Sequence, residues 1–178
     1  MKTNPLTWTF LLLLTIALQL PAQQSEADRK LLADIRAQAE RGDAQSQYEL
    51  GSAFDFGNLG VARDFVEAVK WYQKAAEQNY AKAQFNLGHC YYNGQGVAQD
   101  YVEAVTWWRK AAEQNHVGAQ NNLGNCYANG KGVRRDEVEA VKWYRKSAEQ
   151  NHAHAQNNLG YCYSNGQGVR RDEVEAVK

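Results

Sequence analysis

Three cysteines are the first side chains of this sequence that could carry redox, metal or nucleophile chemistry. Cys90, Cys126 and Cys162 are spaced by 36 residues. If the chain repeats with that period, they occupy equivalent places in helices about 8–10 Å apart. The Cα atoms of a disulfide lie within about 7 Å. We therefore expect the cysteines to stay unpaired as small buried side chains, with a redox or intermolecular role as the alternative.

The four histidines do not form a metal-binding pattern. No His-Glu-x-x-His sequence is present, and His116 and His152 again share one place in the period. His152 and His154 are two residues apart, so they would not face each other on a helix. We therefore expect no metal site and no cofactor.

Serine catalysis also lacks a sequence pattern. None of the serines after residue 22 begins a Ser-x-x-Lys motif. Gly94-Gln95-Gly96 resembles half of a dinucleotide-binding fingerprint, but no predicted strand precedes it and no third glycine follows. Glycine at this place is instead expected to end a helix. The sequence therefore predicts no catalytic residue.

The composition limits the class of protein further. The chain has 178 residues, with 20 basic and 20 acidic side chains and a formal net charge of zero. A nucleic-acid-binding protein needs a basic face to neutralise phosphates, so we expect no nucleic-acid partner. Hydrophobic residues make up 44% of the chain and charged residues 22%, a balance typical of a folded domain or a short repeat array.

The N-terminal segment has the layout of a secretory signal peptide. Met1-Lys2 is a short basic start, an apolar run covers Leu6 to Leu20, and Pro21-Ala22 precedes a polar stretch. The run is shorter than the ~20 residues that span a bilayer. We expect cleavage after Ala22, export to a periplasm or to the outside, and no stable membrane span afterwards. The alternative is that residues 1–22 remain as an N-terminal anchor.

The remainder of the chain is one unit written several times. The pair Leu-Gly recurs at residues 87, 123 and 159, and tryptophan at residues 71, 107 and 143, each spaced by 36. Residues 119–142 and 155–178 are identical at 21 of 24 positions. We divide the chain into a signal peptide at 1–22, a capping helix at 23–42, and repeats at 43–79, 80–115, 116–151 and, truncated, 152–178.

Each unit is predicted to be a helix, a turn and a second helix. In the second unit, helix A covers Ala81 to Tyr92 and ends at a glycine-containing turn. Helix B begins at Asp100, where Asp100 and Glu103 have the spacing of a capping box, and ends at Asn115 in a left-handed conformation. This pattern predicts an all-α fold, an α/α solenoid of helix-turn-helix repeats.

The two ends of the array differ from its middle. Residues 27–41 look like a lone helix B, with Leu31, Leu32 and Ile35 available to cover the first unit. The last copy stops at Lys178, the counterpart of Lys142, inside the predicted helix B. We expect a fragment of a longer array, or an end supplied by something else; the alternative is that the last turns fray.

These residues resemble the Sel1-like repeat, a relative of the tetratricopeptide repeat, over residues 43–178. The resemblance rests on Ala83, Leu87-Gly88, Tyr91, Gly94-x-Gly96-Val97, Asp100, Ala104 and Trp107-Trp108-x-Lys110-Ala111-Ala112. It implies an α/α solenoid and an adaptor or scaffold, in secreted bacterial members often linked to the envelope or to host interaction. A disulfide-rich branch resembles penicillin-binding or weakly β-lactamase-active proteins, but that branch has paired cysteines in each repeat, and this chain has one.

Comparison of the copies indicates where a partner would bind. Four positions of helix A change between units, represented in the second unit by residues 82, 85, 89 and 92. This spacing places them on one helical face, which lines the concave side in tetratricopeptide-like stacks. The candidate binding residues are Tyr48, Phe85, His89, Tyr92, Asn121, Asn125, Asn157 and Tyr161. The alternative is free variation of solvent-facing positions.

The sequence as a whole favours an exported, non-enzymatic scaffold that holds a protein or peptide partner on its concave face. Two other functions stay open. One is an enzyme of the penicillin-recognising or β-lactamase type, which only the family resemblance suggests. The other is a structural spacer within a longer chain, for which substitutions in the variable face would have no functional effect.

Overall fold

The computed structural model describes residues 26–177, so the expected signal peptide lies outside the described residues. A helix over residues 26–40 is followed by seven more helices and a short 3-10 turn, and no strand occurs between residues 26 and 177. The helices are α2 (Ala44–Phe56), α3 (Phe65–Glu77), α4 (Ala81–Asn93), α5 (Tyr101–Glu113), α6 (Val117–Asn129), α7 (Glu137–Ala148) and α8 (Ala153–Asn165), and the turn is η1 (Glu175–Val177).

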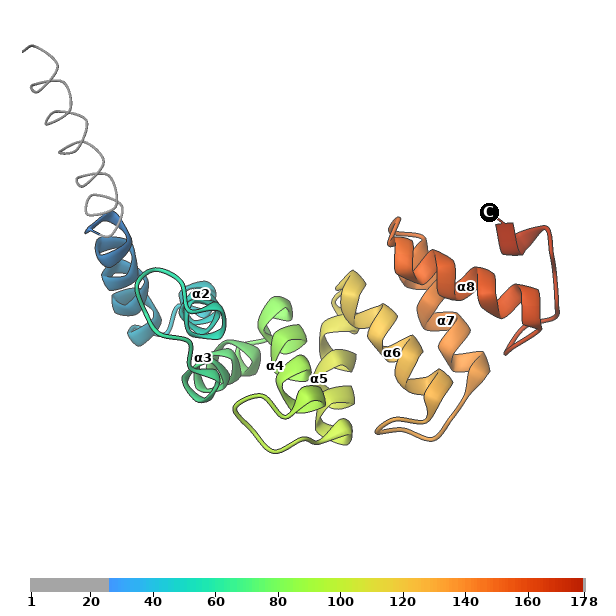
Figure 1. Ribbon diagram of the computed structural model, residues 1–178, viewed down its shortest axis with the longest axis horizontal. Coiled ribbons are helices and arrows are strands. Elements are labelled where there is room, and N and C mark those ends of the chain that lie inside the picture. The colour runs from blue at the N-terminus through green and yellow to red at the C-terminus, as the bar shows by residue number, and fades with distance from the viewer. Residues whose placement is uncertain (1–25, 178) are drawn as a thin grey trace, which may run out of the picture.

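The helices stack in chain order into an elongated, curved array (Figure 1). The pairs α2/α3, α4/α5 and α6/α7 are the A and B helices of three units, and α8 is helix A of the fourth. Each helix B also packs against helix A of the following unit. The predicted α/α solenoid is therefore confirmed.

A large ring of helix B packs directly against a glycine of helix A in each complete unit. In the second unit the ring is Trp108, which is 2% exposed and faces Gly88. A Cβ atom added at Gly88 would lie 2.5 Å from both Cδ1 and Nε1 of that ring. Gly51 faces Tyr72 in the same way. The recurring Leu-Gly pair therefore exists because helix A must approach the aromatic ring closely.

The start of each helix B is capped as expected, but only in part. The Asp100 carboxylate accepts hydrogen bonds from the backbone N–H of Val102 at 2.8 Å and of Glu103 at 3.0 Å. The capping box is incomplete, because the return bond from the Glu103 side chain to the Asp100 N–H does not form. The Asp100 N–H instead donates to the carbonyl of Tyr91 at 2.9 Å, so no donor is left for the glutamate.

The ends of helix B match the sequence-based expectation. Asn79, Asn115 and Asn151 have φ values of 65°, 63° and 62°. Asparagine tolerates this left-handed region better than most residues. The same residue type therefore ends helix B in three consecutive units.

A ladder of buried glutamines sets the distance between units. The side chain of Gln84 donates to the carbonyl of Ala76 at 3.1 Å and accepts from Gln114 of the next helix B at 2.7 Å. Gln120 repeats both bonds, with the carbonyl of Ala112 at 3.3 Å and with the side chain of Gln150 at 2.8 Å. These amides satisfy polar groups at the ends of the B helices and join each A helix to the B helices before and after it.

The first helix covers α2 with fewer side chains than expected. Ile35 and Ala39 are buried together with Leu50, and Leu32 packs at the edge of this cluster. Leu31 is 50% exposed, so its expected covering role is wrong, because it lies on the side of the helix away from α2. At the other end, α8 buries only Ala155 and Cys162.

Candidate binding groove

Two recesses lie between successive A helices. The first recess, between α4 and α6, has a volume of about 230 Å³ and is lined by His89, Tyr92, Asn93, Trp108, Asn122, Asn125 and Cys126. The second recess, between α6 and α8, has a volume of about 410 Å³ and is lined by Asn125, Ala128, Asn129, Arg135, Glu137, Ala140, Tyr144, Asn158, Tyr161, Cys162 and Gln167. Each residue of the first recess has its counterpart 36 positions later in the second. We call the two recesses together the A-helix groove.

Each recess has a buried aromatic ring that is fixed by a hydrogen bond. Trp108 donates from Nε1 to the carbonyl of Phe85 at 3.0 Å. Tyr144, the counterpart in the next unit, donates from its hydroxyl to Oδ1 of Asn125 at 2.8 Å. Because the glycines of helix A confine these rings from the other side, the recesses have rigid walls.

Asparagine side chains connect the A helices across the groove. Oδ1 of Asn125 accepts from the Tyr144 hydroxyl and from Nδ2 of Asn158, the latter at 3.3 Å. Nδ2 of Asn158 also donates to Oδ1 of Asn121 at 3.1 Å. These bonds leave each amide in one orientation, because reversing Asn158 would turn its oxygen toward two other oxygens.

Aromatic rings and two histidines pack together beside the first recess, with His89 in its lining. Phe85 stacks on His116 with ring centroids 4.3 Å apart and meets the edge of His89 at 4.7 Å. Burial lowers the pKa of both His89 and His116 below the ordinary value for histidine, so both rings are neutral at pH 7. Neutral His89 can accept at Nε2 from Nδ2 of Asn122, which lies 3.3 Å away.

The charged side chains at the rim of the groove already have partners. Nζ of Lys131 donates to the hydroxyl of Tyr92 at 2.9 Å. In the second recess, Arg135 forms an ion pair with Glu137. The groove is therefore lined mainly by amides and aromatic rings, with the positive charge of Lys131 at the rim of the first recess.

The structure brings half of the sequence-predicted binding residues into the groove. His89 and Tyr92 line the first recess, Tyr161 lines the second, and Asn125 lines both. Tyr161 is 60% exposed, which makes it the most accessible of the predicted aromatic side chains.

The other four predicted residues do not line either recess. Phe85 and Asn121 lie beneath the groove, where Phe85 packs on histidine rings and Asn121 is 8% exposed. Tyr48 packs near Tyr80, with ring centroids 5.4 Å apart, and Asn157 is exposed beside the groove. Phe85 is therefore half-buried rather than freely exposed, because the next unit places His116 on its ring.

Sequence comparison of the copies missed Asn122, Asn158, Trp108 and Tyr144. The two asparagines are identical between copies, so variation between copies does not select them, and the rings occupy an apolar position of helix B. The signal that could have found them is chemical: asparagine is an unusual choice for a half-buried helical position unless its amide is bonded.

The cysteines are unpaired and buried, as predicted. Burial raises the pKa of the Cys90 thiol to about 12 and that of Cys126 to about 11. Cys126 borders the first recess and Cys162 the second. The three thiols are therefore protonated at neutral pH. Those of Cys126 and Cys162 form an apolar part of the recess that each borders.

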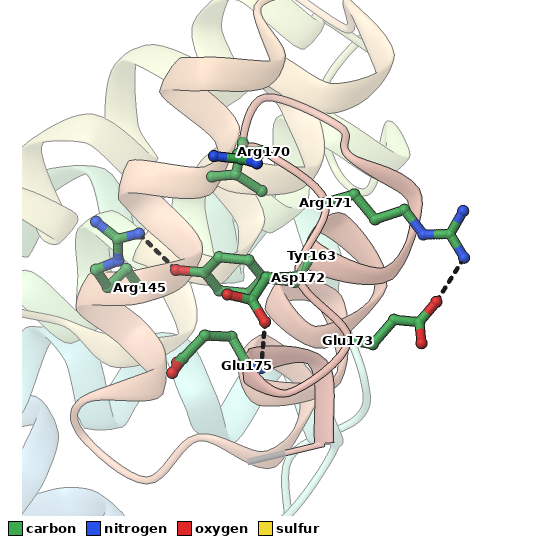
Figure 2. Close-up of a pocket in the computed structure, with 8 residues that line it drawn as sticks. Arg145, Tyr163, Arg170, Arg171, Asp172, Glu173 and Glu175 are labelled. Atoms are coloured by element: carbon green, nitrogen blue, oxygen red, sulfur yellow. Dashed lines mark hydrogen bonds and ion pairs between the residues drawn. The ribbon is translucent and has the colours of Figure 1, made fainter.

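A third hollow of about 820 Å³ lies beside the last turn, between α7 and the loop that follows α8. Figure 2 shows Arg145 bonded to the hydroxyl of Tyr163 and Arg171 paired with Glu173 at 2.7 Å. Asp172 accepts from the backbone N–H of Glu175 at 3.2 Å, as the caps of the B helices do. Internal bonds thus engage Arg145, Arg171, Asp172 and Glu173 in this hollow, whereas the A-helix groove recurs from one unit to the next and is the stronger candidate site.

The described residues hold neither a cluster of metal ligands nor a helix that could cross a bilayer. Within residues 26–177, no three His, Cys, Asp or Glu side chains converge as metal ligands would. Over the same range, every helix is too short or too polar to span a bilayer.

The repeat geometry agrees with a match to a known family. The family model described as Sel1 repeat matches residues 44–80, 81–116, 117–152 and 153–178. The chain belongs to the Sel1 repeat family. Members of this family are generally scaffolds for protein interactions rather than enzymes.

Two solved Sel1 repeat structures are similar to this chain. One is a protective antigen present in uropathogenic Escherichia coli strains, with 44% identity and a TM-score of 0.79 over 82% of this chain and 31% of that one. The other is a Sel1 repeat protein from Oxalobacter formigenes, with 38% identity and a TM-score of 0.79 over 84% of this chain and 59% of that one. The present chain thus spans less than two thirds of either protein.

A curated relative is more distant. The HRD3A component of an ERAD-associated E3 ubiquitin-protein ligase from Arabidopsis thaliana is 32% identical over 60 residues, which are 34% of this chain and 9% of that protein. Cysteine-rich protein B of Helicobacter pylori is 25% identical, with a TM-score of 0.56 over 71% of this chain and 93% of that protein. The matched region thus makes up a small part of the Arabidopsis protein and nearly all of the Helicobacter protein.

Proposed function

We propose that this Sel1 repeat chain is an exported, non-enzymatic scaffold that holds a protein or peptide partner in the A-helix groove, on the concave side of the solenoid. The observation that carries the proposal is the pair of recesses lined by equivalent residues of successive units. A surface that recurs with the repeat can contact an extended partner at several points, each with the same geometry.

The groove supports binding through its rigidity and its mixture of side chains. Trp108 and Tyr144 are held by hydrogen bonds and by close packing against helix A, so little order is lost when a partner binds. The rim adds Tyr92 and Tyr161, which combine apolar surface with a hydroxyl group. Aromatic side chains of this kind provide much of the affinity at protein interfaces.

Export is supported by the N-terminal sequence. The basic start, the apolar run and the polar residues after Ala22 are typical of a segment that is removed during secretion. We therefore place the scaffold in the periplasm or outside the cell. Sequencing the N-terminus of the protein from a periplasmic or culture fraction tests this part, and cleavage after Ala22 is the expected result.

Relatives support a role in an assembly. The Arabidopsis relative is named as a component of a ubiquitin ligase, and it shares only a short stretch with this chain. That name supports the use of Sel1 repeats to join proteins, and we propose the same general use here with a different partner.

Site-specific photo-crosslinking tests the proposed face. A photoreactive phenylalanine derivative would replace Tyr161, which is 60% exposed in the second recess, or Val102, which is 62% exposed on helix B. The two positions are matched in exposure but lie on different helices. We expect a discrete crosslinked protein from position 161 in an extract of the producing cells and none from position 102. Crosslinks from both positions alike, or only from position 102, would refute the groove as the binding face.

A further inference from the structure

We infer that the A-helix groove recognises the main chain of an extended polypeptide segment and takes an uncharged apolar side chain of that segment into the first recess. This inference rests on the proposed function, which it deepens by naming the chemistry of the partner. The groove contains side-chain amide C=O and N–H groups that have no hydrogen-bond partner among residues 26–177.

Three asparagines that line the groove each have one half of the amide engaged. Asn122 uses one hydrogen of Nδ2 toward His89, so Oδ1 is left as an acceptor and the second hydrogen as a donor. Asn125 uses Oδ1 for two bonds, so both hydrogens of Nδ2 are left as donors. Asn158 uses Nδ2 for two bonds, so Oδ1 is left as an acceptor. Within residues 26–177, these remaining amide atoms form no hydrogen bond.

Along the groove the free groups therefore include an acceptor at Asn122, a donor at Asn125, which lines both recesses, and an acceptor at Asn158. A polypeptide main chain offers the complementary alternation, because every residue other than proline has one N–H donor and one C=O acceptor. The amide orientations are fixed within the protein before binding, which limits the entropy lost when a peptide pairs with them.

The spacing also suits an extended chain. Neighbouring packed helices are about 8–10 Å apart, and an extended peptide advances about 3.3 Å per residue. About three residues thus cover one recess, and about six span both. Helical peptides advance only about 1.5 Å per residue and keep their main-chain groups bonded internally, so they do not match this pattern.

The lining of the first recess selects the side chain. His89 is neutral there because burial lowers its pKa, and Cys126 stays protonated because burial raises its pKa. Trp108 and Tyr92 supply aromatic walls. A charged side chain would lose hydration against these uncharged walls, while the amine of Lys131 lies outside at the rim, so the recess interior favours an aliphatic or aromatic side chain.

The test begins with peptides selected from a random library of 12-residue sequences against the folded chain. The selected peptides are expected to share an apolar position and otherwise to vary. Each main-chain N–H of the best peptide would then be replaced in turn by N–CH₃, which removes one donor and leaves the side chains unchanged. We expect methylation at one or two positions to weaken binding by about tenfold, with little effect elsewhere.

The matched variant is Asn125→Asp. The new carboxylate keeps an oxygen that accepts from Tyr144 and Asn158 but replaces the free donor with a second acceptor. We expect the dissociation constant for the selected peptide to rise about tenfold or more, with unchanged circular dichroism. Asn157→Asp, on the exposed side of α8, adds the same charge beside the groove and is expected to change affinity by less than about twofold.

Two outcomes would overturn the inference and differ in what they say of the proposed function. If peptides bind but neither N-methylation nor Asn125→Asp weakens them, main-chain recognition is wrong, while crosslinking from position 161 can still support the groove as a binding face. If no peptide can be selected although position 161 crosslinks to a folded protein, the extended-peptide inference fails and the proposed function stands.

Discussion

Replacing Gly88 by alanine tests the packing principle that shapes the groove. The added Cβ atom would lie 2.5 Å from Cδ1 and Nε1 of Trp108, far inside van der Waals contact. The ring cannot move freely, because it is 2% exposed and its Nε1 donates to the carbonyl of Phe85 at 3.0 Å. The substitution therefore forces α4 and α5 apart or breaks the indole hydrogen bond.

The magnitude follows from three terms. Overpacking of a buried site costs about 1–3 kcal/mol. Weakening the hydrogen bond of Trp108 adds about 1 kcal/mol. Alanine favours a helix over glycine by about 1 kcal/mol, which offsets part of the loss. Gly88→Ala is therefore expected to lower the free energy of unfolding by about 1–3 kcal/mol.

The assay is urea unfolding followed by far-ultraviolet circular dichroism, carried out as a double-mutant cycle with Trp108→Leu. Once the indole ring is gone, the clash is gone, so Gly88→Ala in that background is expected to be neutral or to stabilise by up to about 1 kcal/mol. Equal destabilisation in both backgrounds, or a stabilising Gly88→Ala in the wild-type chain, would refute the argument.

Three further predictions concern the amides, the thiols and the histidines. Gln120→Ala should lower the free energy of unfolding by about 1–3 kcal/mol, because it removes two hydrogen bonds of a buried side chain, to the carbonyl of Ala112 and from the amide of Gln150. Gln156→Ala, at the exposed equivalent position, should change it by less than about 0.5 kcal/mol in urea melts. Cys126 should react with a thiol reagent at pH 8 only on unfolding, since burial raises its pKa to about 11; rapid labelling of the native chain would contradict this. Because burial lowers the pKa of His89, the unfolded chain binds the proton more tightly, so stability should be full above the unfolded pKa of about 6.5 and fall as the pH drops below it. Thermal melts between pH 7 and pH 5 should show a smaller fall for His89→Asn than for the wild type.

The fold could be predicted from the sequence because each repeat carries its own signals. The period of 36 residues, the aspartates before helix B and the left-handed asparagines after it were all visible as residue types. The return bond of Glu103 could not be predicted, because the competing acceptor is the carbonyl of Tyr91 on the preceding helix. That partner comes close only after the two helices have packed.

The candidate site was predictable in part. Variation between copies identified Asn125 and Tyr161, which line the groove, and also Phe85, which the following unit covers with His116. Single-helix periodicity gives the face of a residue but not what the next unit places on it. Asn158 shows the converse: identical copies suggested a core role, while its two bonds to the preceding A helix are part of the groove.

Nuclear magnetic resonance of the nitrogen-15-labelled chain, titrated with the selected peptide or the crosslinked partner, tests the central claim most directly. Two adjacent tryptophans provide an internal comparison, because Trp108 lines the first recess and Trp107 lies beside Lys110 on helix B, 4.0 Å from its amine. The account predicts shifts of the Trp108 indole and of the side-chain amides of Asn122, Asn125 and Asn158, with the Trp107 indole unchanged. Shifts confined to Trp107 and the B helices, with these amides unmoved at saturation, would contradict it.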